Sequence, residues 1–138
     1  MNRFWLVTGG VLVLALAFLA LETPSEQINF TDLETECRYD RTTGFDISLK
    51  PGNVLAFSGH YPVNNTEADL SYRYSRSGDT IKLDIIAKNE TQAPANYFNS
   101  CLASVVYKAQ TSSIPDGRYD VILKHDGQRV EHQVIGIK

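Results

Sequence analysis

Hydrophobic and polar side chains alternate along most of the chain. From residue 28 onward, every second side chain is apolar in stretches such as Phe45–Leu49, Leu70–Tyr74 and Tyr119–Leu123. A period of two is that of a β-strand with one buried face, whereas an amphipathic helix repeats every 3.6 residues. Because turn-forming residues separate these stretches, the pattern predicts strands joined mainly by short turns.

The predicted strands number about eight, at the spacing typical of an all-β domain. They fall within residues 28–39, 45–49, 54–61, 70–74, 81–87, 101–107, 119–123 and 130–138. Turns are predicted at Pro-Gly-Asn 51–53, at Ser-Gly-Asp 77–79 and at Asp-Gly 126–127, which is the strongest hairpin signal in the chain. The sequence therefore predicts an all-β fold, an antiparallel sandwich or small barrel.

The N-terminal segment departs from this pattern. Phe4–Leu21 is a run of eighteen residues without a charge, and Arg3 precedes it. As a helix it would span about 27 Å, close to the roughly 30 Å of a bilayer core. The basic residue before the run and the acidic residues after it favour an outside position for the rest of the chain. Residues 1–21 are predicted to be a signal anchor or a cleaved signal peptide; the lack of a well-placed cleavage site favours the anchor.

Three parts are expected: the leader at 1–21, a short polar stalk at 22–27 and one extracytoplasmic β-sandwich domain at 28–138. A domain of this size can fold without a metal or several disulfides. The net charge of −3 argues against a generic basic nucleic-acid binder. Both versions of the leader export the domain, so we expect it to be membrane-anchored through Phe4–Leu21 or secreted.

Cys37 and Cys101 are the only two cysteines, and both lie in the exported part. Two such cysteines usually pair in an oxidising compartment, and closing a loop of about 64 residues would contribute roughly 4 kcal/mol. The alternative is a pair of buried thiols. Two cysteines are too few for a four-cysteine zinc site, and neither has the neighbouring histidine that a nucleophile needs.

Three N-x-S/T sequons follow the leader, at Asn29, Asn64 and Asn89. They are candidate glycosylation sites if the host glycosylates exported chains, and each is otherwise an incidental match. The connection from Lys88 to Ser100 is the longest one predicted, and long loops often carry binding residues.

Tyr97 and Phe98 are adjacent aromatic residues within that connection. They are candidate anchors for a partner, because aromatic side chains dominate many interfaces. The alternative is that they fold back and cap the core.

No catalytic signature is present. Ser58-Gly59-His60 lacks the G-x-S-x-G pattern of a nucleophile elbow. A tight hairpin at the Asp-Gly turn would set His132 opposite Val121, roughly 13 Å from His125, which is too far for a shared metal. We expect His125 to be a solvated hairpin residue and His132 to be a partly buried strand residue. The sequence predicts a non-enzyme with no cofactor and no metal site.

Ile114–Val121 reads IPDGRYDV and is followed by His-Asp-Gly at 125–127. This stretch resembles a hairpin that is common in exported β-sandwich modules. With the leader, Ser-Gly-Asp-Thr at 77–80 and Cys101–Tyr107, the chain resembles small membrane-anchored or secreted immunoglobulin-like β-sandwich proteins, many of them archaeal. The resemblance implies an antiparallel immunoglobulin-like sandwich and no catalytic residues. Thr-Thr-Gly-Phe at 42–45 is similar to a loop of chagasin-like cysteine-protease inhibitors, which implies inhibition as a less favoured function.

These patterns predict a non-catalytic extracytoplasmic module that binds an envelope protein or glycan or has a structural role in the envelope. The alternative is a subunit of an extracellular filament or surface assembly. It rests on Val130–Lys138, the last strand, which has apolar residues on both faces. Such a strand suits pairing with the sheet edge of a neighbour, which would make the protein a homo-oligomer.

Overall fold

The computed structural model describes residues 27–64, 66–88 and 102–138. These residues form eight strands and no helix, which confirms the all-β prediction. In chain order, the strands are β1 (Ile28–Arg38), β2 (Gly44–Lys50), β3 (Val54–Pro62), β4 (Asp69–Ser77), β5 (Thr80–Lys88), β6 (Leu102–Thr111), β7 (Gly117–His125) and β8 (Gln128–Ile137).

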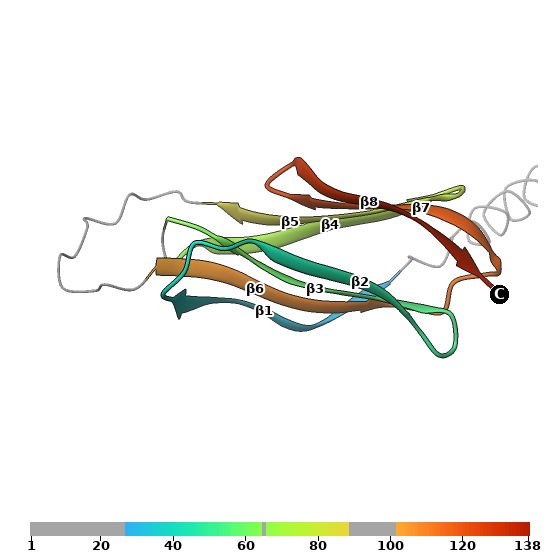
Figure 1. The fold of residues 1–138 in the computed structure, drawn as a ribbon, viewed down its shortest axis with the longest axis horizontal. Helices are drawn as coiled ribbons and strands as arrows, with labels where there is room; N and C mark the ends of the chain where they lie inside the picture. Colours follow the sequence, from blue (N-terminus) through green and yellow to red (C-terminus); the bar gives the residue numbers. More distant parts are fainter. Residues whose placement is uncertain (1–26, 65, 89–101) are drawn as a thin grey trace, which may run out of the picture.

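The strands form two layers that face each other (Figure 1). Sheet A has the order β1-β6-β3-β2 and sheet B the order β4-β5-β7-β8. Neighbouring strands are antiparallel except for β5 and β7, which are parallel. The expectation of a purely antiparallel sandwich is therefore wrong at one pair. The chain leaves sheet B after β5, crosses sheet A as β6 and re-enters sheet B as β7 in the direction of β5.

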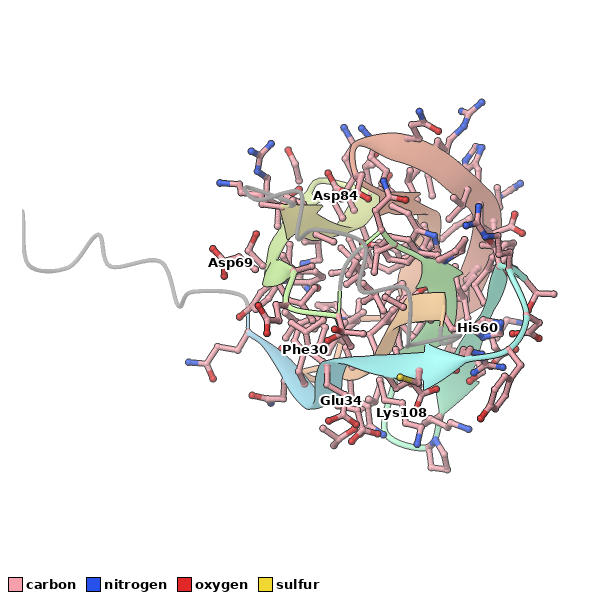
Figure 2. All side chains as sticks on the ribbon, turned by 90° about the vertical axis from the view of Figure 1, so that its left-hand side faces the viewer. Phe30, Glu34, His60, Asp69, Asp84 and Lys108 are labelled. Atoms are coloured by element: carbon pink, nitrogen blue, oxygen red, sulfur yellow. The ribbon has the colours of Figure 1, made fainter. Side chains whose placement is uncertain are left out.

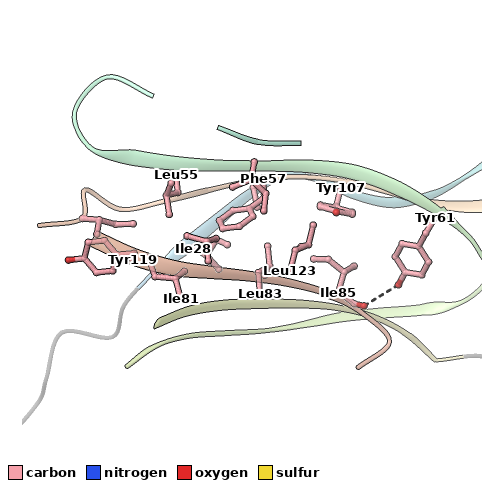
Figure 3. Close-up of a cluster of buried hydrophobic side chains, with 14 of the residues drawn as sticks. Ile28, Leu55, Phe57, Tyr61, Ile81, Leu83, Ile85, Tyr107, Tyr119 and Leu123 are labelled. Atoms are coloured by element: carbon pink, nitrogen blue, oxygen red, sulfur yellow. Dashed lines mark hydrogen bonds between the residues drawn. The ribbon is translucent and has the colours of Figure 1, made fainter. Parts of the chain in front are cut away.

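The core lies between the two sheets and is built from the inward positions of alternating strands (Figure 3). The largest fully buried side chains are those of Leu55, Phe57, Ile81, Leu83, Ile85, Val105, Tyr107, Ile114, Val121 and Leu123. Burial of one such side chain stabilises the fold by about 1.5–3 kcal/mol, before the loss of conformational entropy is counted. The period-two pattern of the sequence is thus the inward and outward alternation of the strands.

The sandwich has two ends, which we name by their position relative to the start of β1. The basal end holds Gln27, the turn at 51–53 and the segment 112–116; there the amides of Ser112 and Ile114 donate to the carbonyls of Gln27 and Asn53. The apical end is opposite and holds the connections at 39–43 and 63–68 and the turn at 126–127.

A bulge sets the register of the last hairpin. Lys124 pairs with Arg129 and Leu123 pairs with Glu131, so Val130 is the extra residue in β8. The Asp-Gly turn forms as predicted, with φ of 50° at Asp126 and 79° at Gly127. The expected position of His132 opposite Val121 is wrong, because the extra residue moves every later side chain of β8 to the other face.

Candidate functional site

A buried histidine closes the apical end of the core. His125 is only 6% exposed. Its ring stacks on Tyr61, with centroids 4.2 Å apart, and meets Tyr107 edge-on at 5.6 Å. The Nε2 atom of His125 is hydrogen-bonded to the hydroxyl of Tyr107 at 2.9 Å. The expectation of a solvated hairpin histidine is therefore wrong, because β7 continues to residue 125 and its inward alternation includes this position.

Burial also decides the protonation states of this cluster. It lowers the pKa of His125 to about 4, a shift that nearby Asp84 opposes and His60 reinforces. Burial raises the pKa of Tyr61 and of Tyr107 well above the usual value for a phenol. At neutral pH the three rings are therefore uncharged. The Tyr61 hydroxyl donates to the carbonyl of Ile85 at 3.2 Å, which ties the cluster to sheet B (Figure 3).

Two glycines make room for aromatic rings at this end. Gly59 lies opposite Tyr107 in the register of β3 and β6. A Cβ atom on Gly59 would lie 2.7 Å from both Tyr107 Cζ and the carbonyl oxygen of Gly44, closer than real Cβ atoms approach. On the outer face, a Cβ atom on Gly44 would collide with the ring of His60. Close packing at the apical end thus depends on the absence of two side chains.

The same small residues leave a groove in the outer face of sheet A. Its volume is about 280 Å³. We call it the His60 groove and define it by Gly44, Asp46, Ser58, His60, Val106 and Lys108, which come from β2, β3 and β6. Figure 2 looks onto the apical end and shows His60 and Lys108 on the sheet A side, away from Asp84.

A chain of hydrogen bonds holds the imidazole at the rim of this groove. Thr42 Oγ1 donates to Asp40 at 3.0 Å and lies 3.2 Å from His60 Nε2. A threonine hydroxyl has one proton, so Nε2 of His60 donates to Thr42 and Nδ1 of the neutral ring is an acceptor. Hydrogen bonds from Thr42 and from Arg38 lower the pKa of Asp40. The chain therefore fixes both the position and the tautomer of His60.

The charges along the groove alternate in sign. Asp32, Lys108, Ser58 and Asp46 are cross-strand neighbours in one row of sheet A. The ammonium group of Lys108 lies 3.1 Å from the Asp32 carboxylate. The groove thus offers an imidazole acceptor, a hydroxyl, an ammonium and a carboxylate. In the described part of the chain no hydrogen bond joins Ser58 to a base of the kind that activates a serine nucleophile.

A second cleft opens between the edge strands of the two sheets, closer to the basal end. It has a volume of about 650 Å³ and is lined by Gln27, Ile28, Asn29, Tyr72, Arg73 and Tyr74. Beside it, Phe30 of β1 packs on Tyr72 of β4 with ring centroids 4.5 Å apart. This contact joins the two edge strands and leaves Tyr72 partly exposed.

The structure separates the sequence-predicted site residues. Asn29 is exposed at the start of β1, and Asn64 is exposed just after β3, so neither sequon side chain is buried. Cys37 lies opposite Ala103 near the apical end of β1, and the described residues hold no free cysteine. Asn89, Tyr97, Phe98 and Cys101 lie outside the described residues, so their proposed roles and the Cys37–Cys101 disulfide stay predictions.

The leader Phe4–Leu21 also lies outside the described residues. Among the residues that are described, no helix has the length and apolar character needed to cross a bilayer. The described strands and turns also hold no group of three or more His, Cys, Asp or Glu side chains able to bind a metal ion.

The sequence did carry a signal for the buried cluster. Tyr119, Val121, Leu123 and His125 share one face of β7, and the first three are the apolar positions of the alternating stretch Tyr119–Leu123. The His60 groove had no comparable signal, because its residues come from three strands that are distant in sequence.

In comparisons with known proteins, the chain matches no family model, no curated protein and no solved structure.

Proposed function

We propose that this chain is a membrane-anchored, non-catalytic extracytoplasmic module that binds its partner with the apical half of its β-sandwich. The observation that carries the proposal is the direction of β1. It begins at Ile28, directly after the six-residue stalk at 22–27. Because six residues span at most about 20 Å, an anchor at Phe4–Leu21 keeps the basal end close to the membrane. The His60 groove then lies on the half that faces away from it.

The chemistry of the groove supports binding over catalysis. The groove offers an imidazole, a hydroxyl, a positively charged ammonium and a negatively charged carboxylate. These groups can form hydrogen bonds or ion pairs with the hydroxyl, amide and carboxylate groups of a glycan or an envelope protein. His60 is held in one tautomer by Thr42, as a specific hydrogen-bond acceptor should be. A groove of this size accommodates one side chain or one sugar ring rather than a whole ligand.

The anchor is tested by fractionating the native envelope. The chain should stay with the membrane after an alkaline carbonate wash, because Phe4–Leu21 is apolar enough to span it. N-terminal sequencing that finds a mature protein beginning near Phe18 or Leu21 would instead establish a cleaved signal peptide.

The groove is tested by filling it. We expect Ser58→Arg, which places a long side chain in the His60 groove, to abolish capture of the native partner from solubilised envelope. Ser48→Arg is the matched control, because Ser48 lies on the same outer face of sheet A, opposite Ala56 and outside the groove. Equal capture by both variants would contradict binding at the groove.

A second candidate function is that of an assembly subunit, and one observation favours it. The last strand, β8, lies at the edge of sheet B. Its segment Gln133–Ile137 has neither a charge nor a proline, the usual protection of an exposed edge. Val134 of this strand is 50% exposed on the outer face of sheet B, where a neighbouring copy would cover it.

Sedimentation of the full-length chain in a neutral detergent separates the two candidates. An assembly subunit should form oligomers that Val134→Lys dissolves and Ser48→Lys does not. A monomer at every accessible protein concentration would rule out the assembly function and leave the binding module.

A further inference from the structure

The outer face of sheet B gathers positive charge. Outward positions of all four strands carry a basic side chain, and we call these residues the cationic face: Arg73, Lys82, Arg118, Lys124 and Arg129. Each of them alternates with inward residues of its strand. Arg73, Asp84, Lys124 and Arg129 follow one another across the sheet as direct cross-strand neighbours. With strands about 4.8 Å apart, this row is roughly 14 Å long.

Two of the acidic groups of this face have a hydrogen-bond or ion-pair partner. Asp84 accepts a hydrogen bond from the amide of Gly127 at 3.0 Å. Asp120 lies 3.0 Å from the imidazole of His132. Across residues 27–64, 66–88 and 102–138, none of the five basic side chains of the cationic face forms an ion pair. The face therefore keeps a net positive charge, because its five basic side chains outnumber Asp69, Asp84 and Asp120, the outward acidic residues of its strands.

The outer face of sheet A behaves differently. Lys108 forms an ion pair with Asp32, and Arg38 forms ion pairs with Glu36 and Asp40. The chain as a whole has a net charge of −3, so acids are not scarce. Lys50 is the basic residue of the sheet A strands for which the described part of the chain shows no ion pair, whereas the outer face of sheet B holds five such residues.

This arrangement is unfavourable to the isolated domain. Lys124 lies directly opposite Arg129 in the β7–β8 register, and like charges in such a position destabilise an antiparallel pair. Arg73 adds a third positive charge to the same row, in which Asp84 supplies the single negative charge. Repulsion between these groups is relieved when an external anion lies across the strands.

The composition of the face indicates the kind of anion. Its outward apolar side chains are Val134, which is exposed, and Ile86 and Ile122, which are half-buried; the outward positions of the described β5, β7 and β8 hold no aromatic residue. The centres of protein interfaces are enriched in aromatic anchors and depleted in charged residues, whereas this face has basic residues on all four strands. A flat surface with separated cations suits a hydrated, extended polymer with repeated negative groups.

We propose that the outer face of sheet B binds an anionic polysaccharide, whose carboxylate or sulfate groups contact Arg73, Lys124 and Arg129 along the row. This surface is distinct from the His60 groove, which lies on the other sheet. The choice of a polysaccharide among polyanions rests on the extracytoplasmic location proposed above. The charge pattern itself does not depend on that location.

The test measures binding of the full-length chain, in neutral detergent, to polygalacturonate, to dextran sulfate and to uncharged dextran. We expect binding to at least one of the two polyanions and none to dextran. Affinity should fall about tenfold or more between about 50 and about 200 mM NaCl, because bound counterions are released. The variant Arg73→Gln/Lys124→Gln/Arg129→Gln should lose most of the low-salt affinity.

The matched control is Arg41→Gln/Lys50→Gln/Lys138→Gln, which removes the same charge from exposed positions outside the cationic face. It should bind within about twofold of the unaltered chain. A second variant, Arg73→Gln/Lys82→Gln, keeps the test decisive if the triple variant does not fold. Both of its positions are exposed.

Four results would overturn the proposal. They are no salt-sensitive binding to either polyanion, an equal loss in the control variant, tighter binding to duplex DNA or anionic lipid vesicles, and salt-sensitive self-association in place of polysaccharide binding. A cleaved leader would refute the membrane anchor without changing any of these binding measurements. Failure of the two proposals is therefore distinguishable.

Discussion

The two ends of the core are closed by different chemistry. At the basal end, Ile114 and Ile137 are 1% and 2% exposed, and Tyr119 donates its hydroxyl proton to the carbonyl of Pro115. At the apical end, a histidine is enclosed by two tyrosines. The basal end therefore combines apolar burial with hydrogen bonds of the chain and of Tyr119, whereas the apical end depends also on the protonation state of a buried imidazole. Functional surfaces commonly lie in regions of lower local stability, and the His60 groove lies on the apical half.

The largest effect expected at the apical end is that of the disulfide. Cys37 lies near this end of β1, and pairing with Cys101 would stabilise the domain by roughly 4 kcal/mol in the chain-entropy model. Unfolding by urea with and without reductant should differ by about that free energy. Intact mass after alkylation should show two reactive thiols only in reduced protein. Two alkylated cysteines in unreduced, denatured protein would contradict the pairing.

Acid should weaken the apical end and not the basal end. The pKa of His125 is lowered to about 4 in the folded protein, from about 6.5 in the unfolded chain. Between these values the unfolded state binds the extra proton, so stability is complete above about pH 6.5 and falls as the pH approaches 4. The loss amounts to about 3 kcal/mol at most.

Urea unfolding of the unaltered chain and of His125→Gln at several pH values isolates this contribution. Carboxylates titrate in the same range in both proteins, so the difference between their pH profiles reports on His125. His132→Gln is the control, because His132 is exposed and lies on the outer face. An unchanged profile in His125→Gln would show that the buried imidazole does not control acid stability.

Substitution of glycine by alanine should have different effects at a tightly packed position and at an open one. Gly59→Ala should destabilise the domain by about 1–3 kcal/mol, because its Cβ collides with Tyr107 and with backbone. Gly136→Ala should be neutral or stabilise by about 0.5 kcal/mol, since nothing lies within 4 Å of its Cβ position. Thermal unfolding of the two variants makes the comparison. Similar melting temperatures would argue against the close packing at Gly59.

Removing one hydroxyl at each end gives the smallest of these effects. Tyr107→Phe leaves Nε2 of the buried His125 without its partner and should cost about 1–2 kcal/mol. Tyr119→Phe removes a partly buried bond to a carbonyl that water can reach, and should cost about 0.5–1 kcal/mol. The two denaturation midpoints measure the difference. A larger loss for Tyr119→Phe would reverse the ranking of the two ends.

The strands and turns were predictable because their signals are local. The period-two runs correspond to the observed strands, and Asn53 and Gly52 adopt the positive φ that their turn requires. Strand order was not predictable in this way, because alternation identifies a buried face and not the neighbouring strand. The parallel pairing of β5 and β7 arises because β6 joins sheet A and β7 returns to sheet B, and the local sequence of these strands does not indicate which sheet each one joins.

The candidate site was harder to predict than the fold. The bulge at Val130 reversed the expected faces of β8, and one inserted residue carries no sequence signal that distinguishes it from regular strand. His125 is buried because the inward alternation of β7 continues to the last residue of the strand, although its position beside a turn favours exposure. The groove at His60 required the register of three strands, which only the tertiary structure supplies.

The route of the chain between the two sheets has a consequence for the rate of folding. Sheet A is complete only when β6 lies between β1 and β3, and Thr31 and Lys108, which are hydrogen-bonded across that pairing, are 77 positions apart. Sheet B likewise needs β7 beside β5, after the chain has passed through the other layer. High contact order of this kind belongs to domains that fold in milliseconds to seconds rather than microseconds. Neither sheet can close during synthesis until most of the domain has emerged, so the exposed edges of β1–β5 need protection from aggregation over that interval.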